Sequence, residues 1–400
     1  MQNDSKLKIT DIIYIGLISV LYVLCYRLFY WMALEYQGKY ISDLAYYVSL
    51  QSSDERVFRF VGLMYKAIYR LMPGHSIEGM VAFTAFMVVL IVLTNYAYIK
   101  FFSEESGASR FEIQLASLLG PFMGSMYIPS LHEYFYRKSF ASFAWHSPTY
   151  FAMIFSGTLC LLFFIKMYES SKEHISWKYW VLTMITGTLS SHAKPSFILN
   201  MIAAMIAVFL IELVKTPAKE KLSTFKRLVV MGLSLVPAGC MVLLLFKIEF
   251  RGEGHAHRGG IDITFGNLLN TEHLAMTVIA GLAFPLIVWI VNYKLIKSKR
   301  YCMPFGIFVM GICQWAPFEE TGARASHGNF DWGLNAGCYY LFLTSIAIAI
   351  NNWHDRENFM KDKPALRNLY FCVLAILLIW HVGSQLVYFY LVYHGNHFYQ

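Results

Sequence analysis

Residues 77–101 read IEGMVAFTAFMVVLIVLTNYAYIKF, a stretch in which charged side chains stand only next to the two ends. A helix of about 20 predominantly apolar residues is long enough to cross the hydrocarbon core of a bilayer. The length and composition of this stretch therefore predict a transmembrane helix. The whole chain shares this character, because 57% of its 400 residues are hydrophobic and only 14% are charged. A soluble domain carries about 25% charged residues.

Similar apolar runs recur along the sequence and predict an all-α, polytopic integral membrane protein, organised as a single transmembrane domain over residues 1–400. We expect about eleven transmembrane helices from the length of these runs. Residues 57–72 are apolar at helical spacing but include three basic residues, so we expect an amphipathic helix on the membrane surface, within the first outer loop. The predicted spans are residues 9–32, 77–101, 111–128, 149–168, 178–193, 197–214, 228–248, 274–293, 301–316, 333–350 and 369–393.

The distribution of Lys and Arg predicts the orientation in the membrane. With the N-terminus in the cytoplasm, the inner segments carry 18 of the 33 Lys and Arg residues and the outer segments carry 11. Cytoplasmic loops of membrane proteins are enriched in Lys and Arg. We therefore expect a multi-pass protein of the cell membrane with its N-terminus inside and its C-terminus outside. The net charge of +8 has the same explanation and does not indicate nucleic-acid binding.

The predicted outer segments have the composition of a functional site. Ten of the 13 histidines fall in them, mixed with acidic, Gly and aromatic residues, whereas the inner loops carry ordinary Lys and Glu. The chain contains no P-loop, no G-x-S-x-G sequence and no Rossmann glycine pattern in context. A cytoplasmic reaction driven by a nucleotide is therefore not expected.

The first outer loop, residues 35–56, reads EYQGKYISDLAYYVSLQSSDER. Asp43 is a candidate general base, because a carboxylate that is partly desolvated near the membrane surface can accept a proton. The alternative is structural, since Ser42 or Asp43 could cap the helix that begins at Leu44. Tyr46 and Tyr47 could line a sugar site beside this carboxylate.

Two further outer candidates stand next to predicted spans. His146 precedes Pro148, which suits the first turn of a helix, and His146 could bind a substrate oxygen or be an interfacial polar residue. Lys194 lies at a tight turn between two spans, where a lysine is costly unless it is paired or meets an anion. Lys194 could also extend its charged end to the interface.

Two later outer loops carry clusters of polar residues. In residues 249–272, the i, i+2 spacing of His255 and His257 is no reliable metal motif, so we expect a flexible loop over a substrate, with a metal site as the alternative. In residues 317–332, Arg324 could bind a phosphate in a bidentate manner or pair with an acid of the same loop. The remaining candidate substrate-binding residues of these loops are Arg258, Glu319, Glu320, His327 and Asn329.

The segments AWHSPTY (144–150), SHAKPSF (191–197) and GARASHGNFDWG (322–333), with the acid in the first outer loop and the surface helix, carry a resemblance. The chain resembles the GT-C superfamily of membrane glycosyltransferases, and in particular uncharacterised bacterial members. The resemblance implies transfer of a sugar from a polyprenyl-phosphate or polyprenyl-diphosphate carrier to a glycan, lipid or protein acceptor on the non-cytoplasmic face. It makes Asp43 the first-loop carboxylate that deprotonates or positions the acceptor, while charge and position make Lys194 and Arg324 the binders of the carrier phosphate.

One departure from the superfamily pattern concerns metal. Many GT-C enzymes carry paired acids in the first outer loop, whereas Asp43 has no acid two residues away. The sequence therefore leaves open whether a divalent cation takes part, and it indicates no other cofactor.

Other classes of protein share some of these features. A polysaccharide polymerase or ligase also uses lipid-linked glycans, but such proteins rely on arginines in large outer loops, and this chain has few. A transporter or lipid flippase usually has internal repeats and charges at mid-membrane. No repeat is found here, and Arg27, Lys247 and His381 are among the few ionisable residues in the predicted spans. A membrane acyltransferase that uses a His or an Arg is the third alternative.

Overall fold

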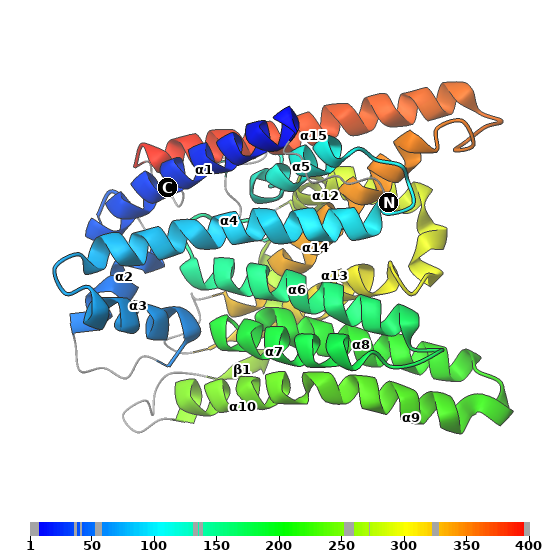
Figure 1. The fold of residues 1–400 in the computed structure, drawn as a ribbon, viewed down its shortest axis with the longest axis horizontal. Coiled ribbons are helices and arrows are strands. Elements are labelled where there is room, and N and C mark those ends of the chain that lie inside the picture. The colour runs from blue at the N-terminus through cyan, green and yellow to red at the C-terminus, as the bar shows by residue number, and fades with distance from the viewer. Residues whose placement is uncertain are drawn as a thin grey trace.

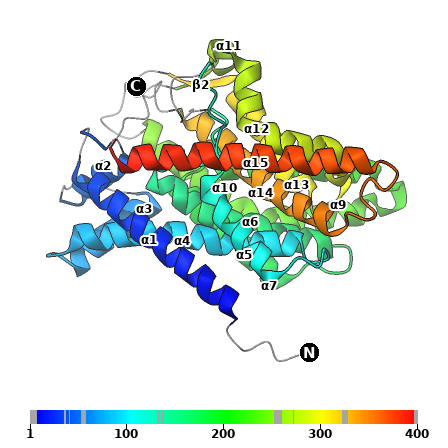
Figure 2. The same cartoon turned by 90° about the horizontal axis from the view of Figure 1, so that it is seen from above.

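The computed structural model shows a bundle of long helices that pass back and forth between two ends (Figures 1 and 2). Eight helical stretches are long and apolar enough to cross a membrane among the described residues. The prediction of an all-α polytopic membrane protein is therefore confirmed. The structure describes residues 8–35, 38–40, 42–52, 58–130, 135, 139–251, 260–271, 273–321 and 328–395.

The eight stretches correspond to predicted spans. They are α1 (Ile9–Leu34), α4 (Ser76–Phe102), α6 (Pro148–Ser170), α8 (Ser196–Lys215), the run Ala218–Ile248, α12 (Leu274–Val291), α14 (Asn329–His354) and α15 (Pro364–Tyr393). The run Ala218–Ile248 takes in η3 (Ala218–Glu220), α9 (Lys221–Gly232), η4 (Leu233–Leu235) and most of α10 (Val236–Arg251). Two shorter helices, α7 (Trp177–Ala193) and α13 (Cys302–Trp315), also occupy predicted spans, and η5 (Tyr293–Lys297) precedes α13.

Helix α14 is the centre of the bundle. In its most apolar window 89% of the residues are buried, whereas the corresponding figure is 28% for both α1 and α15. Helices α4, α8, α12 and α13 pack around α14. The exposed apolar side chains of α1 and α15 therefore form part of the surface that would face lipid.

The predicted span at residues 111–128 is wrong. Helix α5 (Arg110–Leu119) has 10 residues, and after η2 (Gly120–Phe122) the chain is no longer helical. Ten residues of helix rise about 15 Å, half of the hydrocarbon core of about 30 Å. Pro121 explains the end of the helix, because proline has no amide hydrogen and its ring clashes with the preceding turn.

The irregular segment that follows is held inside the protein. His381 of α15 binds the carbonyl oxygen of Gly124 at 2.6 Å, and the amide nitrogen of Met126 donates to Ala280 O at 2.8 Å. The Tyr127 amide donates to Ser384 Oγ at 2.9 Å. Non-helical backbone at membrane depth is tolerated only where protein satisfies its hydrogen bonds. His381, an ionisable residue within a span, therefore has a structural role.

One end of the bundle, which we call the site end, carries the short elements. They are α2 (Asp43–Ser49), η1 (Leu50–Ser52), α3 (Phe60–Leu71), α11 (Gly266–Asn270) and the strands β1 (Ile261–Ile263) and β2 (Phe318–Glu320). The strands pair antiparallel, with Ile261 opposite Glu320. Helix α3 is the predicted amphipathic helix: Val61 and Tyr65 are buried, while Arg70, on the face opposite Val61, is exposed.

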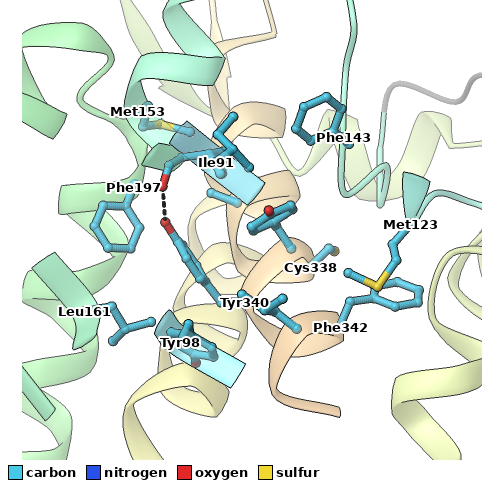
Figure 3. Close-up of a cluster of buried hydrophobic side chains, with 14 of the residues drawn as sticks. Ile91, Tyr98, Met123, Phe143, Met153, Leu161, Phe197, Cys338, Tyr340 and Phe342 are labelled. Atoms are coloured by element: carbon cyan, nitrogen blue, oxygen red, sulfur yellow. Dashed lines mark hydrogen bonds between the residues drawn. The ribbon is translucent and has the colours of Figure 1, made fainter. Parts of the chain in front are cut away.

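A cluster of aromatic and apolar side chains from α4, α6, α8 and α14 fills the core around Tyr340 (Figure 3). The Tyr340 hydroxyl donates to the carbonyl oxygen of Ile154 at 3.4 Å. Gly157 of α6 lies against this ring, because a Cβ built on it would stand 2.6 Å from the hydroxyl and 3.0 Å from Phe197. Helices α6 and α14 therefore approach closely because position 157 has no side chain.

We expect Gly157→Ala to lower the free energy of unfolding by about 1–3 kcal/mol, because the added methyl group overpacks this contact. Thermal melting of the purified protein in detergent measures the change. Gly16→Ala in α1 is the matched control, since a Cβ there meets nothing within 4 Å. Equal melting temperatures for the two variants would contradict the packing argument.

Candidate functional site

Asp43 stands at the first position of α2, with its side chain exposed at the site end. The N-cap of α2 is Ser42, whose Oγ accepts a hydrogen bond from the Leu44 amide at 3.1 Å. Of the two capping residues considered from the sequence, Ser42 is therefore the one that caps. The carboxylate of Asp43 lies in the first turn, where the helix dipole favours a negative charge.

The start of α2 is fastened to the loop that leads into α6. Ser42 Oγ donates to the carbonyl oxygen of His146 at 2.8 Å, and the Asp43 amide donates to the same oxygen at 3.2 Å. Pro148 is the first residue of α6, as the sequence predicts. These contacts bring Asp43 and His146, 103 positions apart in the chain, to one place.

His146 lies between two opposite charges. Its side chain is buried, and burial lowers its pKa to about 4, although the Asp43 carboxylate raises that pKa and the Lys194 ammonium lowers it further. The imidazole is therefore neutral at neutral pH. Three sequence candidates from separate loops are thus close enough to act on one another electrostatically.

Trp332 of α14 joins this group, and the sequence analysis did not single it out. The Lys194 ammonium stands 3.6 Å from the centroid of the Trp332 ring, and the His146 ring lies 5.7 Å from it. Tyr150 packs against the same indole at 5.2 Å. Lys194 itself is buried at the C-cap of α7, where the helix dipole favours a cation. The signal for Trp332 was its place in the segment GARASHGNFDWG.

The 317–332 cluster is largely held by hydrogen bonds in its described part. Asn329 Nδ2 donates to both carboxylate oxygens of Glu320, at 2.8 and 2.7 Å. Asp331 Oδ1 accepts from Ser139 Oγ at 2.8 Å and from Trp315 Nε1 at 2.9 Å. These contacts tie the start of α14 to β2 and to the loop before α6.

Some of the remaining candidate residues from the sequence are described by the structure, and others are not. Glu319 accepts a hydrogen bond from Thr264 at 2.6 Å, which links the two loops beside the β1–β2 pair. Tyr46 and Tyr47 pack edge to face on α2, with ring centroids 5.8 Å apart. The remaining five predicted residues lie outside the described part of the chain: His255, His257, Arg258, Arg324 and His327.

The described residues do not offer a divalent-cation site. Within the described ranges, no three His, Cys, Asp or Glu side chains gather as metal ligands. Glu320 and Asp331 already accept hydrogen bonds from Asn329, Ser139 and Trp315, as given above. The carboxylate at position 43 alone is too few ligands to hold such an ion.

Comparison with known proteins identifies the fold. No protein-family model matches the sequence, and no curated protein matches it. The chain is similar to the crystal structure of the Archaeoglobus fulgidus oligosaccharyltransferase in complex with zinc and sulfate, at a TM-score of 0.50 and 13% identity. The match covers 92% of this chain and 52% of that one, so the chain spans about half the length of that enzyme. The chain therefore shares its fold with that structure, which agrees with the resemblance seen in the sequence.

We expect the burial of neutral His146 to make stability depend on pH. Because its folded pKa of about 4 lies below the usual value near 6.5, the unfolded chain binds more protons in that range. Its contribution, up to about 3 kcal/mol, is therefore present above pH 6.5 and is lost as the pH falls towards 4. Melting curves from pH 7.5 to 4 should show a smaller loss for His146→Gln than for wild type. Parallel curves would contradict the prediction.

Proposed function

We propose that this protein is a GT-C-type glycosyltransferase that moves a sugar from a polyprenyl-phosphate or polyprenyl-diphosphate carrier to a glycan, lipid or protein acceptor on the non-cytoplasmic face. One observation carries the proposal. Asp43, His146 and Lys194 come from three separate loops and meet at one end of a bundle with the fold of an oligosaccharyltransferase. The group combines an exposed carboxylate, a neutral imidazole and a buried cation.

Asp43 acts as the general base in this proposal. Its carboxylate takes the proton of the acceptor hydroxyl while that oxygen forms a bond to the anomeric carbon of the sugar. The bond between the anomeric carbon and the carrier oxygen breaks, and the carrier phosphate leaves with the electron pair. The hydrogen bonds from Ser42 and Asp43 to His146 O hold the carboxylate in position.

Lys194 and Arg324 hold the carrier phosphate in this proposal, from donor binding until that phosphate leaves. A cation in a partly dry site stabilises developing negative charge better than one in water. Lys194 is suited to this role because it is buried against Trp332, which orients its ammonium group. Tyr46 and Tyr47 contribute aromatic faces beside Asp43 for the sugar.

The polar residues of the two later loops complete the site in this proposal. Glu319, Glu320 and Asn329 shape its rim through the hydrogen bonds described above. His255, His257, Arg258 and His327 are proposed to contact substrate, since in the sequence they shortly precede β1 or follow β2.

Asp43→Asn is expected to reduce sugar transfer by about 10²–10⁴-fold. The melting temperature should stay unchanged, because Ser42 makes the helix cap and the Asp43 side chain is exposed. The measurement is transfer of a radiolabelled sugar from a polyprenyl-phosphate carrier by the reconstituted protein. Glu35→Gln is the matched control, since it removes another exposed acid from the same loop, and it should retain near-normal transfer. Normal transfer by Asp43→Asn would remove Asp43 from the mechanism. It would direct attention to Asp54, a later acid of the first outer loop, and to Glu319.

Lys194→Met should weaken donor binding more than it slows the chemical step. Methionine keeps an apolar chain against Trp332 but removes the charge that would meet the phosphate. A hydrogen bond to a charged group contributes about 1.5–3 kcal/mol, so KM for the lipid-linked donor should rise by about 10–100-fold. Lys166→Met is the control, because that lysine of α6 also lies over aromatic rings, Phe101 and Tyr179, but far from the site. An unchanged KM in Lys194→Met contradicts phosphate binding by this residue.

A further inference from the structure

A cavity of about 930 Å³ lies at the end of the bundle opposite the site end. Helix α6 begins beside His146 and ends at the cavity with Tyr168, and α8 begins near Lys194 and ends there with Lys215. The remaining walls come from the segment that joins α8 to α9, from α9, from the end of η5 and from α13 as far as Met310. This end of the bundle is the predicted cytoplasmic side.

The mouth of the cavity is basic. Two acidic residues, Glu212 and Glu220, line the cavity, against five cations, which leaves an excess of three positive charges. Lys172, Lys215 and Lys297 are exposed, whereas Arg227 and Lys299 are half-buried. The five cations are Lys172, Lys215, Arg227, Lys297 and Lys299.

The half-buried groups are fixed in place. Both oxygens of Glu212 are engaged, one by Tyr168 Oη at 2.6 Å and the other by Arg227 Nη2 at 2.5 Å. Lys299 Nζ donates to Tyr168 O at 3.0 Å. Burial lowers the pKa of Lys299; Glu212 raises that pKa, and the Arg227 and Lys172 cations lower it. The Glu212 carboxylate is therefore already paired with Arg227, and the cavity keeps an excess of positive charge.

The inner part of the cavity is apolar. Helix α8 contributes Ala204, Ala207, Val208 and Ile211, and α13 contributes Phe305, Gly306, Val309 and Met310. Beside this wall, α8 exposes Ile206 at 50%, Leu210 at 57% and Val214 at 77%, as a helix facing lipid does. The cavity thus combines a cationic mouth at one end of the helices with an apolar wall beside the lipid-facing surface.

We propose that this cavity binds an anionic phospholipid, with its phosphate among the cations at the mouth and an acyl chain along α8 and α13. Charge complementarity carries the choice, because basic pockets between transmembrane helices on the cytoplasmic side bind anionic lipid head groups. A free phosphate would use only the mouth, whereas a phospholipid matches both the basic and the apolar parts. The site is separate from the proposed glycosyl-transfer site.

The first test removes two of the three exposed lysines of the mouth. The full chain, purified in detergent, is titrated with phosphatidylglycerol or with phosphatidylcholine, and bound lipid is counted by native mass spectrometry. One Lys or Arg contributes about 1 kcal/mol of attraction to anionic lipid, about fivefold in affinity. Lys215→Gln with Lys297→Gln should therefore bind phosphatidylglycerol about 25-fold more weakly.

The matched control is Lys219→Gln with Lys221→Gln, which removes the same charge from exposed positions nearby that do not line the cavity. It should bind phosphatidylglycerol within about twofold of wild type. Equal losses in the two double variants would show a general attraction of charge and overturn the proposal. Equal affinity of the wild type for phosphatidylcholine would overturn it as well.

The second test addresses the acyl chain. Ala207→Trp fills the apolar wall and leaves every cation in place, so it should weaken phosphatidylglycerol binding about tenfold, the effect of about 1.4 kcal/mol of lost apolar burial. Ile206→Trp, at an exposed position outside the cavity, is its control. Inorganic phosphate should not displace the lipid at millimolar concentration. Full displacement by phosphate, or no effect of Ala207→Trp, would show a free-anion site and overturn the lipid assignment.

Discussion

The need to satisfy every backbone hydrogen bond at bilayer depth is the constraint on which this structure depends. A helix meets it locally, which is why nearly all spans are helices. The chain after Pro121 cannot meet it locally, so α12 and α15 supply the partners through Ala280, His381 and Ser384. The irregular segment is therefore stable only because the helices around it are already packed.

This irregular segment also shapes the site end. Its described residues follow η2, and the residues just before α6 place the His146 carbonyl oxygen where Ser42 and Asp43 donate to it. The end of the helix at Gly120–Pro121 and the position of the Asp43 carboxylate are therefore linked through the segment that ends at His146. A continuous helix in place of the irregular segment would not carry His146 to the start of α2 in this way.

The two ends of the bundle stabilise their cations in different ways. At the site end, the Lys194 ammonium is buried against the Trp332 indole and next to a neutral imidazole. At the opposite end, several cations share a cavity and Glu212 is already engaged with Arg227. A buried cation is costly unless its surroundings compensate. Aromatic contact provides compensation at one end, and solvent exposure with a few carboxylates provides it at the other.

Features that depend on local composition could be predicted from the sequence alone. Residues 77–101 form a helix because an apolar run of that length has no better way to satisfy its backbone in a membrane. Pro148 begins α6 and Ser42 caps α2 because these preferences act within one turn of helix. The all-α class, most spans and the amphipathic α3 follow from the same kind of local signal.

Features that depend on distant partners were decided only by the tertiary structure. Residues 111–128 are apolar enough for a span, yet their second half is irregular and accepts hydrogen bonds from, or donates them to, residues more than 100 positions away. The sequence also did not predict the contact of Lys194 with Trp332. Nor did it predict the hydrogen bonds that Asp331 accepts from Ser139 and Trp315. Each depends on how helices from separate parts of the chain pack, and sequence spacing carries no signal for such a contact.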